Sequence, residues 1–328
     1  MKACLPLSVS LSESKPVTDT SKDISGKYRQ ITVIGAGLIG SSVARGIVRA
    51  RATDKLVLVD ANADVLAEAR VLELADAYSS DAATAVTDAD LIILAVPVGA
   101  MATVGALIGP QLKAGATVSD VGSVKASVLN GLQPHIPDGV HLIPGHPVAG
   151  TEQSGPAAGF ASLFDDRWCI LTPAENTEPV ALEKLTAFWA LLGSRVEIMT
   201  AEHHDLVLAI TSHVPHLIAY NIVGTASDME EVTRSEVIKY SAGGFRDFTR
   251  IAASDPTMWR DVFLNNKDAV LEMLGRFSED LTALQRAIRW GDGDALFNLF
   301  DRTRNIRRRI IDAGQDDEAA DFGRPHKD

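Results

Sequence analysis

The chain of 328 residues is poor in cysteine, in aromatic side chains and in positive charge. Its two cysteines are Cys4, close to the N-terminus, and Cys169, in an apolar run, so we expect no disulfide framework and a reducing cytoplasm. The formal net charge of −12 disfavours nucleic acid or an anionic membrane as a partner. We also expect no membrane association, because no stretch approaches the ~20 apolar residues of a membrane span.

Hydrophobic residues make up 46% of the chain and charged residues 23%, an ordinary water-soluble composition whose length predicts two domains. Residues 1–27 are rich in Ser, Thr, Asp and Lys and are predicted to form a disordered leader. Residues 313–328 are acidic, contain Gly and Pro, and are predicted to form a frayed tail. The ordered part is therefore expected between residues 28 and 312.

Residues 28–200 alternate short apolar runs with helical patterns, which predicts an α/β domain built on a doubly wound sheet. The expected strands are Ile31–Ile34, Leu56–Val59, Leu91–Val96, Ala116–Ser119, Val140–Ile143, Trp168–Leu171 and Arg195–Met199. The expected helices are Leu38–Ala50, Ala63–Leu74, Ala100–Ile108, Lys125–Leu132 and Pro179–Leu192. Residues 201–312 show a 3.6-residue apolar period instead, as at Leu206, Ile210, Val214 and Leu217, and are predicted to form an all-helical domain.

A glycine-rich loop follows the first expected strand and opens the first expected helix. It consists of Gly35, Ala36, Gly37, Leu38, Ile39 and Gly40, the Gly-x-Gly-x-x-Gly pattern of a Rossmann-type dinucleotide site. The first glycine permits the tight turn, the second lets the backbone approach a pyrophosphate, and the third lets helix and strand pack closely. A methyltransferase that binds S-adenosylmethionine could use a similar loop, although the third glycine favours a dinucleotide.

Asp60 ends the next strand, 20 residues beyond Gly40, where a carboxylate accepts hydrogen bonds from the adenosine ribose. It would repel a 2′-phosphate, and Ala61 and Asn62 supply no arginine to neutralise one, so NAD is expected rather than NADP. The alternative is that Asp60 only caps a helix. Val96 and Pro97 lie at the C-terminal edge of the expected strand that begins at Leu91, and the loop there is expected to lie on the nicotinamide side of the cofactor.

Two further stretches place a hydroxyl, a lysine, an imidazole and a carboxylate just beyond expected strand ends. They are Asp120-Val-Gly-Ser-Val-Lys125 and Gly145-His-Pro-Val-Ala-Gly-Thr-Glu152. In an open parallel sheet this edge is where cofactor and substrate meet. In the second half, Ser212-His-Val-Pro-His216 places polar groups three and four residues apart on one helix face, with Pro215 expected to kink the helix.

Together these motifs resemble the prephenate/arogenate dehydrogenase family, as does Gly243-Gly-Phe-Arg-Asp-Phe-Thr-Arg-Ile-Ala-Ala-Ser-Asp-Pro-Thr-Met-Trp259. The likeness extends over about residues 28–312. It implies NAD(P)-dependent oxidation of a cyclohexadienol with loss of the ring carboxylate as CO2. Prephenate would give 4-hydroxyphenylpyruvate and arogenate would give tyrosine. With the cofactor reading above, it implies an NAD-dependent enzyme of tyrosine biosynthesis whose helical domain forms a homodimer.

The resemblance also implies roles for single residues. His146 would accept the hydroxyl proton as general base, and Ser123 would share that hydrogen bond; alternatively, His146 is only satisfied by backbone groups. Ser212, His213 and His216 would contact substrate or cofactor, unless they form a buried polar seam between helices.

Arg250 would bind a substrate carboxylate with its bidentate fork. Arg246 competes for this role, and a surface ion pair of Arg250 with Asp247 or Asp255 is the plainer alternative. Trp259 would pack beside the site or simply fill the core. Glu152 could hold the ammonium of arogenate, or pair with Arg250 or Lys125, so the choice between the two substrates stays open.

The run His203-His-Asp205 has a metal-like composition, but neighbouring helical side chains diverge by ~100° and hydride transfer needs no metal. We therefore expect no metal and a solvated first helical turn there. The basic residues between Arg302 and Arg309 are expected on the solvated face of a late helix. Two other functions remain open: a two-domain dehydrogenase acting on a β-hydroxyacid or imine, and a non-catalytic NAD-sensing protein.

Overall fold

The structure is a computed structural model that describes residues 25–233 and 243–312. Most of the expected leader and the whole expected tail lie outside the described residues, as does Cys4. The chain divides into two compact units between Ala201 and Glu202. The first unit carries all of the strands of the described residues, and the second is helical, which confirms the predicted fold class.

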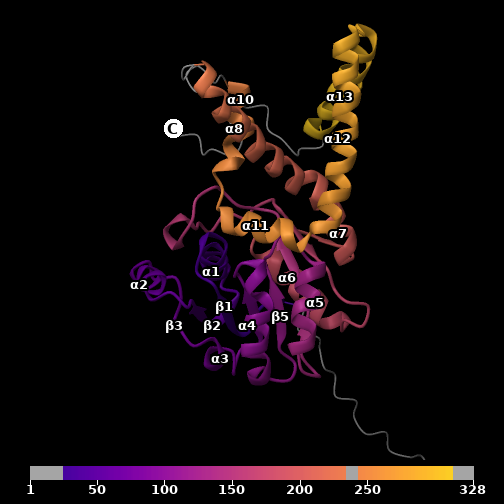
Figure 1. Cartoon of the computed structure of the whole chain (residues 1–328). Coiled ribbons are helices and arrows are strands. Elements are labelled where there is room, and N and C mark those ends of the chain that lie inside the picture. Colours follow the sequence, from indigo (N-terminus) through magenta and orange to yellow (C-terminus); the bar gives the residue numbers. More distant parts are fainter. Residues whose placement is uncertain (1–24, 234–242, 313–328) are drawn as a thin grey trace, which may run out of the picture. The chain divides into compact units, whose positions relative to one another are not determined.

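A six-stranded parallel sheet forms the centre of the first unit (Figure 1), with the strand order β3-β2-β1-β4-β5-β6. Its strands are β1 (Tyr28–Ile34), β2 (Thr53–Val59), β3 (Ala77–Ser79), β4 (Leu91–Leu94), β5 (Thr117–Asp120) and β6 (His141–Leu142). The order reverses between β1 and β4, so the crevice at their carboxyl ends is the place where such sheets bind ligands. The sequence patterns missed only the short strand β3 in this sheet.

Helices cover both faces of this sheet, and alternate strand residues point into two separate cores. On one face, Ile31 and Val33 of β1 pack in a core with α1, α2 and α6, where Phe188 and Trp189 are fully buried. On the other face, Ile34 packs with α3, α4 and α5. Burial on both faces explains why the strands are continuous apolar runs. The helices are α1 (Leu38–Ala50), α2 (Ala63–Val71), α3 (Ala82–Ala85), α4 (Met101–Ile108), α5 (Ala126–Leu132) and α6 (Pro179–Leu191).

A second sheet of three strands, with the order β7-β8-β9, corrects part of the prediction. It contains β7 (Gly145–Pro147), β8 (Trp168–Leu171) and β9 (Arg195–Ile198), and β7 runs antiparallel to β8. The last two expected strands therefore exist but do not extend the main sheet. His146 follows the end of β6 as expected, but it lies within the unexpected strand β7, opposite Ile170. A Gly-His-Pro strand has none of the β-branched residues that mark strands in a sequence.

The described residues of the second unit form helices. They are α7 (Ala201–Leu208), α8 (Val214–Thr233), α10 (Gly243–Thr249), α11 (Pro256–Asn265), α12 (Lys267–Trp290) and α13 (Gly293–Asp312). A π-helical turn, Ala209–His213, joins α7 to α8. Pro215 does not end the helix, because helical turns continue without a break from Ala201 to Asp228 and the π-helical turn lies directly before this proline. Instead of the kink expected at Pro215, the helix has a wide π-helical turn just before this residue.

One helical run, Ala201–Asp228, is long and apolar enough to cross a membrane by length and composition. The expectation that no such segment exists is therefore wrong, because the apolar residues are spread between polar ones instead of forming an unbroken run. Three buried polar side chains lie along it, namely His204, Asp205 and His213. Length and composition alone therefore do not make this run a membrane span.

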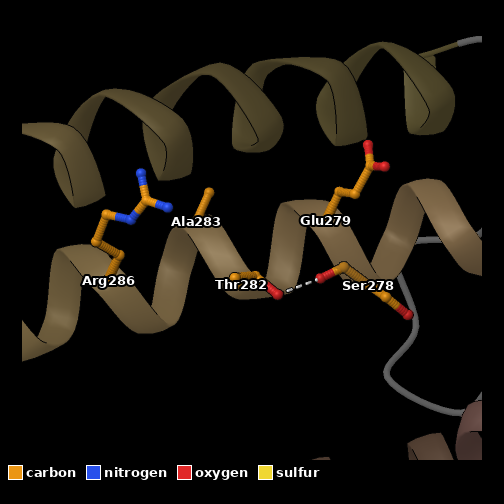
Figure 2. Close-up of a pocket in the computed structure, with 5 residues that line it drawn as sticks. All are labelled: Ser278, Glu279, Thr282, Ala283 and Arg286. Carbon is orange, nitrogen blue, oxygen red and sulfur yellow. Dashed lines mark hydrogen bonds between the residues drawn. The ribbon is translucent and has the colours of Figure 1, made fainter.

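The long helices α12 and α13 expose many large apolar side chains. Those more than half exposed are Leu271, Ile288, Trp290, Phe297 and Phe300. A shallow hollow on α12 is lined by Ser278, Glu279, Thr282, Ala283 and Arg286 (Figure 2), and it contains none of the expected site residues. The arginines between 302 and 309 on α13 are exposed, as expected.

Candidate active site

The glycine loop leaves no room for a side chain at its first and third glycines. Gly35 has a φ of +102°, and an added Cβ would lie 2.3 Å from the carbonyl oxygen of Ala95 at the end of β4. A Cβ on Gly40 would lie 1.9 Å from the carbonyl oxygen of Gly35. Both positions therefore require glycine for steric reasons, which is the close strand–helix packing that the pattern predicts.

Gly37 differs, because an added Cβ there would meet no atom within 4 Å. It is the N-cap of α1, the helix Leu38–Ala50, and no side chain caps that end. The first N–H groups of a helix have no intrahelical partner and carry a partial positive charge, so they favour phosphate. Open space beside an uncapped 13-residue helix fits the pyrophosphate of a dinucleotide.

Asp60 follows β2 and is hydrogen-bonded to the glycine loop. Its Oδ2 accepts from the Ala36 backbone N–H at 2.9 Å, and its Oδ1 accepts from the Asn62 backbone N–H at 2.9 Å. The N-cap of α2 is Asn62 and not Asp60, so the alternative that Asp60 only caps a helix does not hold. Each oxygen of a carboxylate can accept a further hydrogen bond, so Asp60 can still bind a ribose hydroxyl.

Val96 and Pro97 lie directly after β4, the strand beside β1. A Cβ built on Gly35 would lie 3.3 Å from Cγ1 of Val96, so this side chain packs against the glycine loop. The loop after β4 is thus at the sheet's reversal point, next to the residues expected to hold the dinucleotide.

Ser123 and His146 lie on two segments that share one buried ion pair. Asp120 at the end of β5 pairs with Lys125, which also donates to the backbone carbonyl of Gly145 at 2.7 Å. Both charged side chains are completely buried, whereas Ser123 is half-buried and His146 is 6% exposed. Burial raises the pKa of Asp120, and Lys125 opposes that shift. Lys125 therefore has a structural place in this unit.

Glu152 lies in the irregular loop after β7 and is half-buried. It is six residues beyond His146 on the same connection.

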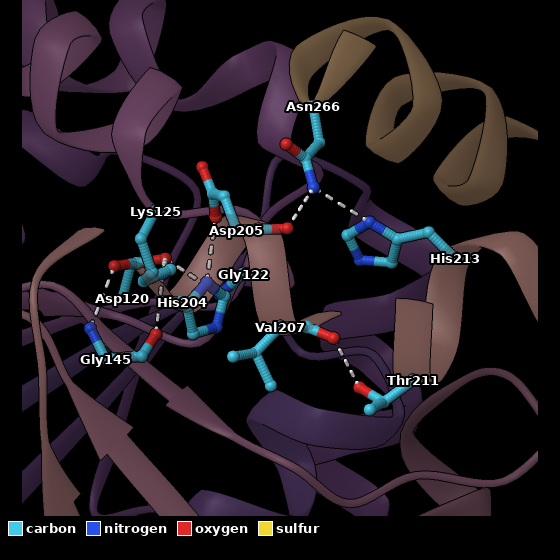
Figure 3. Close-up of polar contacts among 10 residues, drawn as sticks. All are labelled: Asp120, Gly122, Lys125, Gly145, His204, Asp205, Val207, Thr211, His213 and Asn266. Atoms are coloured by element: carbon cyan, nitrogen blue, oxygen red, sulfur yellow. Dashed lines mark hydrogen bonds and ion pairs between the residues drawn. The ribbon is translucent and has the colours of Figure 1, made fainter. Parts of the chain in front are cut away.

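In the second unit, Asn266 bonds to two positions that lie more than 50 residues away in the sequence. Its Nδ2 donates to the backbone carbonyl of Asp205 at 2.8 Å and contacts Nδ1 of His213 at 3.1 Å (Figure 3). An amide N–H can only donate, so Nδ1 of His213 accepts and the ring proton is on Nε2. Sequence reasoning missed Asn266, because an asparagine between two helices indicates at most a cap.

The expectation of a solvated turn at residues 203–205 is wrong for two of its three residues. His203 is exposed, but His204 is fully buried and Asp205 is 5% exposed. Nδ1 of His204 lies 2.8 Å from Oδ1 of Asp205, and the Asp205 carbonyl accepts from Asn266. Neighbouring residues on a helix can thus both be buried when a hydrogen-bonding partner comes from a distant segment.

His216 stacks on Trp259 with ring centroids 3.7 Å apart and an interplanar angle of 24°. Its Nδ1 lies 2.8 Å from the Ser212 carbonyl, which can only accept, so a neutral His216 carries its proton on Nδ1 and a lone pair on Nε2. Burial, helped by the positive charge of Arg250, lowers the pKa of His216. The ring protons of the two neutral histidines therefore lie on opposite nitrogens, Nε2 in His213 and Nδ1 in His216. Trp259 is 6% exposed and also meets His213 edge-on at 6.1 Å.

Arg250 is half-buried at the start of the 3₁₀ turn Arg250–Ala253, after α10. The competing Arg246 is exposed, and its Nε lies 3.9 Å from Oδ1 of Asp247. Asp247, one of the two partners considered for Arg250, thus lies within ion-pair distance of Arg246. Within this unit the structure brings His213, His216, Trp259 and Arg250 together, with the Ser212 carbonyl holding His216.

Two family models match the chain. The nucleotide-binding domain of prephenate dehydrogenase matches residues 43–198, and the prephenate dehydrogenase dimerization domain matches residues 200–302. The first match begins after the glycine loop, so the loop is independent support for a dinucleotide site.

The chain is also similar to individual proteins over most of its length. It is 45% identical to a cyclohexadienyl dehydrogenase of Zymomonas mobilis, over 85% of this chain and 95% of that protein. A crystal structure of prephenate dehydrogenase from A. aeolicus, in complex with hydroxyphenyl propionate and NAD+, is 32% identical with a TM-score of 0.81 and covers 86% of this chain and 98% of its own. A Synechocystis arogenate dehydrogenase is 26% identical with a TM-score of 0.72, covering 86% and 99%. The chain belongs to the prephenate dehydrogenase family.

Proposed function

We propose that this chain is an NAD-dependent dehydrogenase that oxidises and decarboxylates prephenate, arogenate or both. The observation that carries the proposal is the 45% identity to a cyclohexadienyl dehydrogenase over 85% of the chain, with the motif residues held in ordered positions. The product is 4-hydroxyphenylpyruvate from prephenate and tyrosine from arogenate. Aromatisation of the ring makes the reaction effectively irreversible.

The cofactor is NAD, and the A. aeolicus relative is described with NAD+ bound. Gly37 and the uncapped end of α1 would hold the pyrophosphate, and Asp60 would bind the ribose. Gly35, Gly40 and Val96 shape the crevice, and Pro97 begins the loop on the nicotinamide side. When bound, the oxidised nicotinamide accepts a hydride from the substrate's ring carbon.

His146 is the general base for the substrate hydroxyl, with Ser123 sharing the hydrogen bond. A neutral imidazole takes up a proton near pH 7, and such help contributes about 10²- to 10⁴-fold to the rate. A rigid strand position supports this role, because a base must be held within hydrogen-bonding reach of the proton it removes.

Arg250 binds a substrate carboxylate, and His216 with Trp259 forms a wall of the substrate site. Neutral His216 offers a lone pair on Nε2, so its partner on the substrate would be a hydroxyl or ammonium group. Ser212 supports this wall through its carbonyl, and His213 through its contact with Trp259. Glu152 would hold the ammonium of arogenate.

The helical unit forms a homodimer in the cytoplasm. Its matching family model is described as a dimerization domain. Large exposed apolar side chains on α12 and α13, such as Ile288, Trp290 and Phe297, are the kind of surface that a second copy of the chain covers. The same argument accounts for the exposed apolar positions Ile222 and Val223 on α8.

The test is NADH formation by the purified chain with prephenate and with arogenate, each in the presence of NAD+ or NADP+. Rapid turnover of at least one substrate with NAD+, with the aromatic product identified by chromatography, is expected. No turnover with either substrate would refute the function, while NAD+ binding without turnover would favour the sensing alternative. A preference for NADP+ would refute the role of Asp60.

A further inference from the structure

The Asp120–Lys125 pair directs its described hydrogen bonds at the backbone of two segments. Asp120 Oδ2 accepts from the Gly122 N–H at 2.8 Å, and Oδ1 accepts from the Gly145 N–H at 3.1 Å. Lys125 Nζ donates to the Gly145 carbonyl at 2.7 Å (Figure 3). Gly122 directly precedes Ser123, and Gly145 directly precedes His146.

Such a pair is a costly way to gain stability. Removing two charges from water carries a penalty that their mutual attraction often fails to offset, and apolar side chains of similar volume commonly do as well. Both side chains here are completely buried. Hydrogen bonds from a buried pair to two particular peptide segments fix the position of one segment relative to the other. Apolar packing fixes such a position less exactly.

The pair holds Gly145 on both sides of its Cα. The N–H group goes to Asp120 and the carbonyl to Lys125, so the peptide planes before and after Gly145 are both fixed. Gly145 also packs closely on β5, since an added Cβ would lie 3.0 Å from the Asp120 carbonyl oxygen. The second of these planes leads directly into His146.

We propose that Asp120 and Lys125 are positioning residues that fix the separation of Ser123 and His146, so that both can reach one substrate hydroxyl. This inference rests on the roles proposed for those two residues above. A group about 1 Å out of place can cost about 10²-fold in rate even when binding is intact. The pair would therefore act on turnover and not on the affinity for NAD+.

The experiment compares Lys125→Met, the double variant Asp120→Asn/Lys125→Met and the control Lys113→Met. Lys113 also makes a Lys–Asp pair, with Asp90 at 2.5 Å, but this pair lies before the amino ends of β4 and β5, whereas the proposed site residues follow the carboxyl ends. Lys125→Met leaves a lone buried carboxylate and is expected to lower the melting temperature. The double variant removes both charges, so its melting temperature should recover.

The expected result is a kcat lowered about 10- to 100-fold in the double variant, with the NAD+ Kd within 2- to 3-fold of the parent. The control should keep its kcat. In parallel, the imidazole NMR signal of His146, assigned as the one lost in His146→Asn, should shift in the double variant and not in the control.

A purely structural role predicts that kcat recovers with the melting temperature. A double variant with normal kcat and an unmoved His146 signal would overturn the inference. If the parent chain turns over neither substrate, the proposed function fails, and the NMR signal still decides whether the pair positions His146.

Discussion

Asn266 offers a sharp test of the helical unit, because its side chain is buried and contacts two identified groups. Asn266→Ala removes the donor to the Asp205 carbonyl and to Nδ1 of His213. Each buried polar group left unsatisfied costs about 1–3 kcal/mol, so the variant should lose about 2–6 kcal/mol of unfolding free energy. The neighbouring Asn265 is the matched control, since it makes a single bond to the Asp261 carbonyl within one helix turn.

Urea unfolding of parent, Asn266→Ala and Asn265→Ala at one fixed protein concentration measures this difference. Asn265→Ala should cost about 0.5–1.5 kcal/mol, the net value of one hydrogen bond. A second variant, Asn266→Asp, places a carboxylate where only a donor fits, so it should be destabilised and should draw a proton onto Nδ1 of His213.

Nitrogen NMR of the histidine rings reads that proton directly. The parent should show His213 with the proton on Nε2 and His216 with the proton on Nδ1. An Asn266→Ala variant no less stable than Asn265→Ala, or a parent His213 protonated on Nδ1, would refute the reasoning.

Three further predictions concern the proposed site. Arg250→Ala should raise the substrate KM about 10- to 100-fold, the value of a charge-assisted hydrogen bond, and change kcat far less; steady-state kinetics would expose a pure kcat loss. His146→Asn should lower kcat about 10²- to 10⁴-fold with the NAD+ Kd unchanged, and near-normal turnover would remove His146 from the chemistry. The folded pKa of His216 lies below 6.5, so the unfolded chain takes up that proton first and stability falls as pH drops below about 6.5. Unfolding free energies at pH 7 and pH 5 should therefore differ more in the parent than in His216→Gln, and equal differences would contradict the lowered pKa.

The sequence predicted the elements whose local signals agree with their packing. Leu38–Ala50 was predicted with the bounds that α1 has, because glycines define its start and an apolar stripe faces the sheet. The main sheet followed from apolar strands buried on both faces. The resemblance drawn from the motifs agrees with the family models.

What the sequence did not predict depends on distant partners. Gly145–Pro147 is a strand because β8 pairs with it, although its residues do not favour strands. His204 and Asp205 are buried in a segment whose backbone bonds to Asn266, 61 residues from Asp205. The π-helical turn lies just before Pro215, where a kink was expected, because a proline predicts an irregularity in a helix but not its form.

Asp60 has two roles, and together they constrain how this chain can be redesigned to use NADP. Exchanging Asp60 for an apolar or basic residue would remove the proposed repulsion of a 2′-phosphate, but it would also remove the acceptor that holds the Ala36 N–H. Glycines 35 and 40 tolerate no compensating side chain. Successful redesign must therefore include a new acceptor for that amide, for example an asparagine carbonyl at position 60 combined with a cation further along the β2–α2 connection.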